Sequence, residues 1–296
     1  MALSKKPRRP RSLVKQKLSA RMARHFDQGA VADFLAKLPG PPDHEALNEA
    51  QGLVYDAWEE RTPTNQVAMA KKALSLSPLC ADAWVLLGGL ASTPIEALDC
   101  YQRGVVSGAA AIGEVGFEDY AGHFWGFLET RPYMRARAGL AETLWALGRH
   151  TDAINHLQAM LELNPGDNQG LRYVLASHLL ELDNMPALQA LLDEHEDASA
   201  LWLYTRALVA FKTGAPTADE FAKEAFEANP HVPLLLARKK VAVEVGPFIT
   251  WGGEDEAALY VAENRAGWEG APRAIDWLLE ITPSTAAKEP AKRGGK

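Results

Sequence analysis

The chain has 296 residues, 47% hydrophobic and 23% charged, which is typical of a folded globular protein. Its two cysteines exclude a disulfide framework, and the lack of a CxxC pair or Cys/His cluster predicts no metal site and no cofactor. The net charge of −7 is uneven, because residues 1–25 carry nine Lys or Arg and no acid. The remaining body is therefore acidic, which disfavours non-specific nucleic-acid binding, although the basic segment could contact a polyanion weakly.

No stretch of the sequence approaches the ~20 apolar residues of a membrane-spanning helix. The basic N-terminus lacks the apolar segment that follows the basic residues of a secretory signal. Two cysteines without a disulfide pattern also suit a reducing compartment. We therefore expect a cytoplasmic protein with no membrane span.

In chain order, the pattern is helix, short turn, helix, with no convincing strand. Pro39-Gly40-Pro41-Pro42 interrupts a first helical segment, and Asp43 is placed to cap a helix that runs to about Glu60. The expected parts are a disordered basic arm at 1–25, an N-terminal helix and Pro-rich turn at 26–46, helical repeats at 47–230, capping helices at 231–283 and a disordered tail at 284–296.

Recurring small and large residues indicate a repeat. Ala153 and Pro165 lie twelve residues apart, as do Ala218 and Pro230, and Ala187 follows Ala153 by 34 residues. Antiparallel helices approach closely only where side chains are small, and a proline ends the second helix because it lacks an N–H. We expect about five helix pairs, beginning near Leu47, Ala81, Met134, Asn168 and Ser199.

These positions resemble the tetratricopeptide repeat, which implies an all-α superhelix of helix pairs. Arg137 departs from the pattern, because a large apolar residue usually stands at that position. The alternative is a generic helical bundle whose alanine spacing arose by chance.

An insert at residues 105–132 separates the second and third pairs. It contains glycines and the aromatic residues Phe117, Tyr120, Phe124, Trp125 and Phe127. This combination predicts an ordered loop packed against the repeats, rather than a linker.

Polar residues after the insert suggest a binding groove. In repeat register, Arg135 and Glu142 lie on the groove side of one first helix, and Gln169 and Arg172 on the same side of the next. Two such arginines could bind a carboxylate or phosphate bidentately. The candidate binding residues are His123, Arg131, Arg135, Glu142, Trp145, Asn168, Gln169 and Arg172.

A structural role is the alternative for this cluster. Its arginines, Arg137 included, could pair with Glu129, Glu142 and Asp167 and brace the insert, and Asp167 is also a good helix N-cap. A single histidine beside Phe124 and Trp125 is more often a hydrogen-bonded packing residue than a base or a ligand.

The C-terminal part has its own pattern. Asn229-Pro230-His231-Val232-Pro233, then Gly252, Glu256, Ala257 and Tyr260, and later Trp268, resemble the suppressor-of-tumorigenicity-seven family over about residues 135–280. The segments GHFWG, ETRPYMRAR and NPGDNQGLRY resemble bacterial tetratricopeptide proteins over about residues 47–280. The resemblance implies helical repeats and an interaction role, and it supplies no catalytic residue.

Three functions follow from the sequence. The leading hypothesis is a protein-interaction scaffold that binds a peptide or partner protein in the concave groove of the repeats. The alternative is nucleic-acid or ribosome association through the basic arm. A remote alternative is an enzyme with a site at residues 123–173, but no nucleophile–base grouping, phosphate loop or HExxH pattern supports catalysis, so we expect no catalytic residues.

Overall fold

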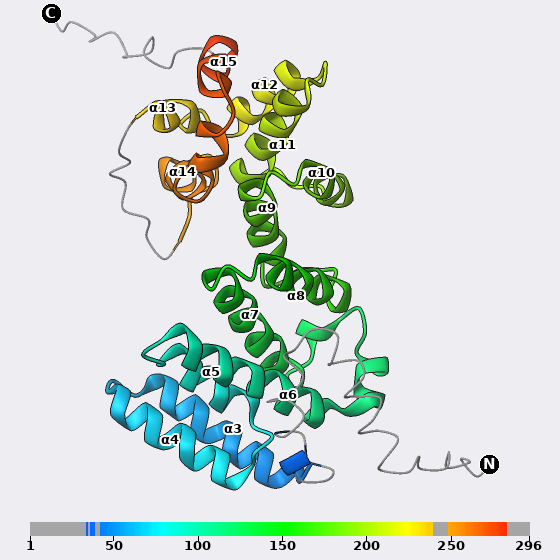
Figure 1. The fold of residues 1–296 in the computed structure, drawn as a ribbon, viewed down its shortest axis with the longest axis vertical. Helices are drawn as coiled ribbons and strands as arrows, with labels where there is room; N and C mark the ends of the chain where they lie inside the picture. Colours follow the sequence, from blue (N-terminus) through cyan, green and yellow to red (C-terminus); the bar gives the residue numbers. More distant parts are fainter. Residues whose placement is uncertain (1–33, 35, 39–41, 239–247, 283–296) are drawn as a thin grey trace, which may run out of the picture. The chain divides into compact units, whose positions relative to one another are not determined.

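The computed structural model describes residues 34, 36–38, 42–238 and 248–282 (Figure 1). Within these residues, all regular structure is helical. The expected all-α class with helices packed in neighbouring pairs is confirmed. The predictions for the basic arm and for the tail at 284–296 fall outside the described residues, as does most of the helix expected before the Pro-rich turn.

The chain divides into two compact units, residues 1–171 and 172–296. In the first unit, helices of successive pairs contact one another, as do the two helices within each pair (Figure 1). Its elements are α3 (His44–Glu59), α4 (Pro63–Leu76), α5 (Ala81–Gly89), α6 (Pro94–Asp119), the short 3-10 helix η1 (Phe124–Gly126), α7 (Arg131–Ala146) and α8 (His150–Leu163).

The second unit contains two further pairs and the C-terminal helices. These elements are α9 (Leu171–Glu181), α10 (Met185–Glu194), α11 (Ala200–Thr213), α12 (Ala218–Ala228), α13 (Val232–Ala237), α14 (Glu254–Glu269) and α15 (Ala274–Ile281). The first helices of the five pairs thus begin within three residues of the expected starts.

Local sequence signals explain where several helices begin. Asp43 caps α3 as predicted, its Oδ1 accepting hydrogen bonds from the N–H groups of Glu45 and Ala46 at 3.0 and 3.2 Å. Thr93 caps α6, and Pro94 follows at a position where its missing N–H costs nothing. These helix ends depend on neighbouring residues only, which is why the sequence predicts them.

The insert differs from its expected form. Helix α6 continues to Asp119, with a break in helical geometry at Gly113 (φ 69°), so the prediction of a loop throughout 105–132 is wrong. The reason is packing, because a Cβ on Gly104 would stand 3.0 Å from Ala136 Cβ, and one on Gly108 would stand 3.0 Å from Tyr133 Cα. These glycines let α6 approach α7 closely, and only the segment from Tyr120 to Thr130 is loop and 3-10 helix.

Small residues also form the core of the first two pairs. Ala50 and Ala57 of α3 are fully buried against Ala70 and Ala73 of α4, together with Val54. This arrangement is the one that alanine spacing predicts for closely packed antiparallel helices.

The C-terminal helices cover the last pair as expected. Trp277 of α15 stacks on Phe211 of α11, with ring centroids 4.6 Å apart, and Trp268 is fully buried. Helix α14 begins at the acidic residues Glu254–Glu256, whose negative charge suits the positive end of the helix dipole. Of the segment between α12 and α14, the structure describes helix α13, and residues 239–247 lie outside the described part.

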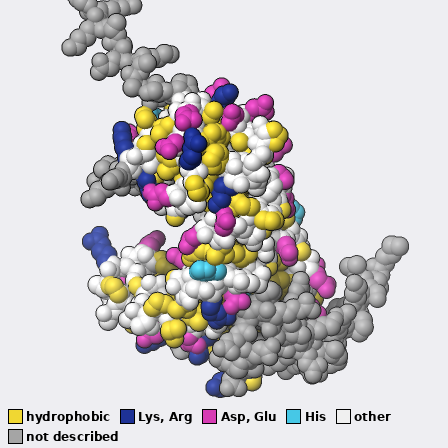
Figure 2. All heavy atoms as spheres, turned by 45° about the horizontal axis from the view of Figure 1, so that its top comes forward, with side chains coloured by type: hydrophobic (Ala, Val, Ile, Leu, Met, Phe, Trp, Pro, Cys, Tyr) yellow, Lys and Arg dark blue, Asp and Glu magenta, His cyan; other side chains and the backbone are white. Residues whose placement is uncertain are grey.

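On the face drawn in Figure 2, acidic and basic side chains are interspersed with hydrophobic ones. Side chains of both signs therefore lie on that face.

Candidate functional site

The candidate site of the first unit is built on three consecutive first helices, α3, α5 and α7. Asp82 of α5 is fully buried, and its Oδ2 accepts a 2.7 Å hydrogen bond from Gln51 Nε2 of α3. Arg135 of α7 donates to the same carboxylate, from Nε to Oδ1 at 2.8 Å and from Nη2 to Oδ2. A continuous polar chain thus crosses the first helices of three pairs.

The ion pair with Asp82 changes the pKa of the Arg135 guanidinium. Burial lowers the pKa of the guanidinium, but the hydrogen bonds and charge of Asp82 outweigh this effect, and the net pKa is raised. Both oxygens of Asp82 are engaged by Arg135, so a bidentate grip of Arg135 on a ligand carboxylate would compete with this pair. Asp82 therefore holds Arg135 in place. This agrees with the structural alternative for the arginines, in which they pair with acids of the same chain, although Asp82 was not among the expected partners.

Exposed aromatic side chains lie beside this ion pair. Tyr55 and Trp58 of α3 are 47% and 38% exposed, and their ring centroids are 5.6 Å apart. The Arg135 guanidinium lies 5.4 Å from the Trp58 ring. Aromatic groups next to a fixed guanidinium offer a partner apolar area and stacking surface at small entropic cost.

Two other candidates on α7 have different surroundings. Glu142 is exposed, and after burial it is the next cause of the raised pKa of Tyr101. Trp145 is half-buried and stacks on His150, with centroids 4.2 Å apart.

Around the insert, the predicted residues lie in several environments. His123 is exposed and precedes η1, and its N–H donates to the Tyr120 carbonyl. Arg131 donates from Nε to the Trp125 carbonyl at 2.9 Å, and its guanidinium lies 5.5 Å from the Trp125 ring. Arg131 thus holds the loop, through a carbonyl and a ring rather than through Glu129.

Arg137, the departure from the repeat pattern, is 6% exposed. It donates to Tyr133 Oη at 2.9 Å and to His156 Nδ1 at 3.1 Å. The long side chain fills the space of the usual apolar residue, and its polar end has hydrogen-bond partners within the same unit.

The turn before α9 corrects one expectation. Asn168 and Gln169 precede the helix, which begins at Leu171, so Gln169 does not lie on the same first helix as Arg172. Positive φ angles at Asp167 (44°) and Gly170 (70°) hold the chain out of the helix. Asp167 acts at the helix start as predicted, its Oδ1 accepting from the N–H of Leu171 at 2.7 Å.

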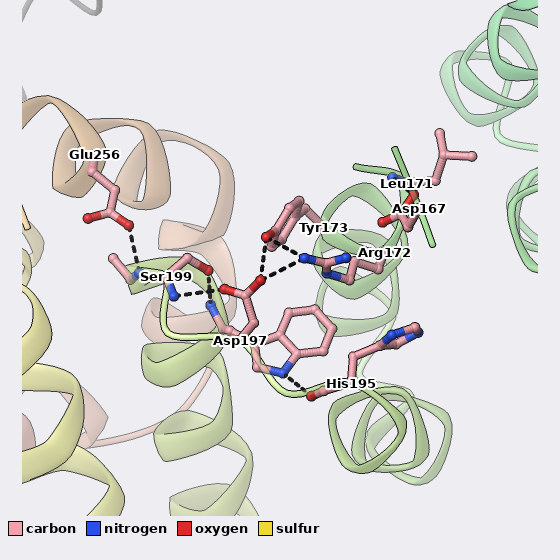
Figure 3. Close-up of polar contacts among 10 residues, drawn as sticks. Asp167, Leu171, Arg172, Tyr173, His195, Asp197, Ser199 and Glu256 are labelled. Atoms are coloured by element: carbon pink, nitrogen blue, oxygen red, sulfur yellow. Dashed lines mark hydrogen bonds and ion pairs between the residues drawn. The ribbon is translucent and has the colours of Figure 1, made fainter. Parts of the chain in front are cut away.

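In the second unit, Arg172 has a carboxylate partner of its own (Figure 3). Its Nη2 lies 2.7 Å from Asp197 Oδ2, and its guanidinium lies 4.6 Å from the ring of Tyr173. Tyr173 donates to the same oxygen, and the N–H of Ser199 donates to Oδ1 at 2.7 Å. Asp197 thereby ties the start of α9 to the start of α11.

The pKa values of this cluster follow from the contacts. Burial raises the pKa of Asp197, but the hydrogen bonds from Ser199, Tyr173 and Arg172 lower it more, so the net pKa is below its usual value. Burial also lowers the pKa of Arg172, and the bond to Asp197 outweighs that effect. The pair is therefore ionised at neutral pH.

The described residues contain no group of three or more His, Cys, Asp or Glu side chains that could hold a metal. Among those same residues, none of the helices combines the length and apolar character that crossing a bilayer requires. A hollow of about 350 Å³ lies in the second unit, between the ends of α13 and α14 and the start of α15, and not at residues 123–173.

In comparison with known proteins, the chain is similar in sequence to the suppressor-of-tumorigenicity-seven proteins. It is 27% identical over 268 residues to human "Suppressor of tumorigenicity 7 protein-like", a match that covers 81% of this chain and 46% of the human protein. The chicken protein of the same name is 27% identical over 80% of this chain and 47% of its own length. These matches confirm the predicted resemblance. "Protein ST7 homolog" of Drosophila melanogaster is 25% identical over 79% of this chain and 49% of its own length.

The match to the suppressor-of-tumorigenicity-seven proteins is broader than residues 135–280, since it covers about four-fifths of the chain. The chain spans about half the length of these curated relatives. No family model matches the sequence, so the tetratricopeptide assignment stays a prediction.

Several of the residues that carry the suppressor-of-tumorigenicity-seven resemblance form hydrogen bonds with one another. Buried Glu256 accepts hydrogen bonds from Asn229 Nδ2 at 3.0 Å and from the N–H groups of Gly252 and Ala200, both at 2.8 Å (Figure 3 shows the bond to Ala200). Trp268 Nε1 donates to Tyr260 Oη at 2.7 Å. These residues join α11, the α12–α13 turn and α14, which assigns them a role in the cap.

Sequence reasoning missed Gln51, Tyr55, Trp58, Asp82 and Asp197. One signal was present, because Asp82 and Arg135 are each the second residue of a predicted unit, after Ala81 and Met134. Residues at one position of successive repeats lie side by side in a solenoid, and opposite charges there predict an ion pair. The exposed aromatic residues gave no such signal, because Tyr and Trp on a helix are as often buried.

Proposed function

We propose that this chain is a non-enzymatic interaction scaffold, and that the surface formed by Tyr55, Trp58 and Arg135 binds a partner protein through an extended peptide. The observation that supports this proposal is the exposure of two aromatic rings beside a guanidinium that Asp82 holds in place. Aromatic and arginine side chains dominate the energetics of protein interfaces. A surface fixed in advance lowers the entropic cost of binding.

The cytoplasm is the compartment we propose for this function. Cys80 and Cys100 are both free thiols. Reduced cysteines are typical of proteins kept in a reducing environment.

The test has to separate binding from folding. Replacing Arg135 by Ala would leave the buried Asp82 carboxylate without its charged partner, so lost binding could reflect lost stability. The pair Tyr55→Ala and Trp58→Ala removes the exposed rings and retains Asp82 and Arg135, the two partners of the ion pair. Phe248→Ala with Trp251→Ala is the matched control, because these side chains of the second unit are 88% and 72% exposed.

The experiment is quantitative affinity purification from the native host with all three forms of the chain, after circular dichroism has shown equal helix content. We expect at least one protein to be enriched by the wild type and the control and lost with the Tyr55/Trp58 variant. A peptide of that protein should then bind the purified wild type with an affinity weakened by about tenfold or more in the variant. Equal enrichment by all three forms would contradict the proposal.

A further inference from the structure

Helix α3 has an unusual charge composition. Residues 43–60, which comprise α3 and its two flanking residues, contain six acids and no Lys or Arg. Glu49, Asp56 and Glu59 are exposed, and none of them forms an ion pair with a described residue. The nearest bases in the sequence are Lys37 before α3 and Arg61 in the turn before α4, followed by Lys71 and Lys72 of α4.

The helical period places these acids together. With 3.6 residues per turn, Glu59, Asp56 and Glu49 follow one another around the helix from Tyr55, and the last two lie on the side roughly opposite to Gln51. Gln51 points to Asp82 of α5, so Asp56 and Glu49 lie on the side of α3 that faces away from the polar chain, and Glu59 lies between them and Tyr55. The exposed surface of α3 is thus an aromatic edge, Tyr55 and Trp58, next to an acidic strip, which we call the acidic α3 surface (Glu49, Tyr55, Asp56 and Glu59).

One segment of the same chain has the opposite composition. The arm at residues 1–25 carries nine Lys or Arg and no acid. It lies outside the described residues. Lysine and arginine side chains pair with carboxylates and also lie favourably over aromatic rings, so both parts of the acidic α3 surface suit this segment.

Chain connectivity keeps the arm close to this surface. Phe34 packs edge-to-face on Trp84 of α5, with ring centroids 5.9 Å apart, and α5 contacts α3. The residues from 26 to 34 can reach roughly 30 Å when extended, whereas a helix of 16 residues is about 24 Å long. A tether of this length gives the arm an effective concentration in the millimolar range, at which individually weak ion pairs suffice for docking.

We propose that the basic arm, residues 1–25, docks on the acidic α3 surface of its own chain. Docking would cover Tyr55 and compete with the partner proposed above. The inference rests on the proposed function only in taking the exposed face of α3 as a binding surface.

Trypsin offers a direct test on the full chain, because the arm contains its cleavage sites. Cleavage after Lys15, Lys17, Arg21 and Arg24 is followed by mass spectrometry at low salt, in the wild type and in the variant Glu49→Gln, Asp56→Asn, Glu59→Gln. We expect the variant arm to be cut about threefold to tenfold faster, and the difference to fall at 0.5 M NaCl, where screening shortens the range of these attractions.

A matched variant controls for net charge. Glu196→Gln, Glu220→Gln and Glu227→Gln remove three exposed acids of the second unit, and its arm should be cut at the wild-type rate. Equal rates in all three proteins would overturn the proposal. The proposal would also be overturned if the arm of the control variant were cut as fast as the arm of the α3 variant. General attraction of the arm to an acidic protein surface would then explain its protection.

A second measurement does not depend on proteolysis. A synthetic peptide of residues 1–25 is titrated into a full chain whose own arm carries Lys5→Gln, Lys6→Gln, Arg8→Gln, Arg9→Gln and Arg11→Gln. We expect the peptide to bind, and we expect the three α3 substitutions to weaken its affinity. Equal affinities with and without these substitutions would overturn the proposal. These outcomes leave the capture experiment unaffected, so arm docking and partner binding can fail separately.

Discussion

Asp82 of α5 and Arg135 of α7, the first helices of successive pairs, form an ion pair in which the Asp82 side chain is fully buried. The pair joins α5 to α7 across the insert, and its two residues are 53 positions apart in the sequence. Gln51 extends the connection to α3. The ion pair therefore holds the first helices of three pairs in register, and it determines the orientation of the guanidinium beside Trp58.

Arg135→Ala should destabilise the first unit, because it leaves a buried carboxylate with Gln51 as its only side-chain partner among the described residues. We expect a loss of about 2–3 kcal/mol, less than for a fully buried pair because Arg135 is 26% exposed. Urea unfolding followed by circular dichroism measures it. Arg149→Ala breaks a surface pair with Asp152 and should cost roughly 0.5 kcal/mol or less. Equal losses in the two variants would contradict the structural role of the buried pair.

The stabilising effect of Asp197 should depend on pH. Its pKa is lower in the folded chain than in the unfolded one, so the stabilisation is complete above the unfolded value of about 3.9. It is lost as pH falls through the lower folded pKa. The difference in Tm between the wild type and Asp197→Asn should thus be constant from pH 5 to 7 and shrink below about pH 4. A difference that grows on acidification would show the opposite sign of the shift.

The two cysteines should react at different rates. Burial raises the pKa of the Cys80 thiol to about 11, so that roughly a thousandth of it is thiolate at pH 8. Burial also raises the pKa of Cys100, but this side chain is only half-buried. A thiol reagent at pH 8 should modify Cys100 slowly in the folded chain and Cys80 only after unfolding. Cys100→Ser should abolish the native-state reaction, and a fast reaction in that variant would contradict the burial of Cys80.

Two helical glycines should respond to alanine in opposite directions. A Cβ on Gly139 would stand 2.3 Å from the Tyr101 ring, so Gly139→Ala should destabilise by about 1–3 kcal/mol through overpacking. Gly52 in α3 has no atom within 4 Å of that position, so Gly52→Ala should stabilise by roughly 0.5–1 kcal/mol. Urea midpoints give both values. A stabilising Gly139→Ala would mean that Tyr101 does not pack in the notch this glycine leaves.

Much of the fold could be predicted from local signals. Asp43 predicts a helix start and the recurring alanines predict close helix pairs, because capping and small-residue packing involve neighbouring or regularly spaced residues. The insert was predicted incorrectly. Its glycines are typical of a loop when only the sequence is considered, whereas in the fold Gly108 permits close contact between α6 and α7.

The candidate site could be predicted only in part. The sequence identified Arg135 and Arg172 as distinctive, and the tertiary structure supplied their partners, Asp82 and Asp197. The choice between a ligand site and an internal brace depends on which carboxylate a guanidinium meets. That meeting depends on residues far apart in the chain.

By itself, the sequence determined the helical class, the five helix pairs, the C-terminal cap and the unequal charge of the basic arm and α3. Periodicity, capping and charge are local properties, and they can be read along one dimension. Only the tertiary structure decided that Asp82 is buried under Arg135 and that Tyr55 and Trp58 stay exposed. Burial and ion pairing depend on which helices become neighbours, and that is a property of the folded chain alone.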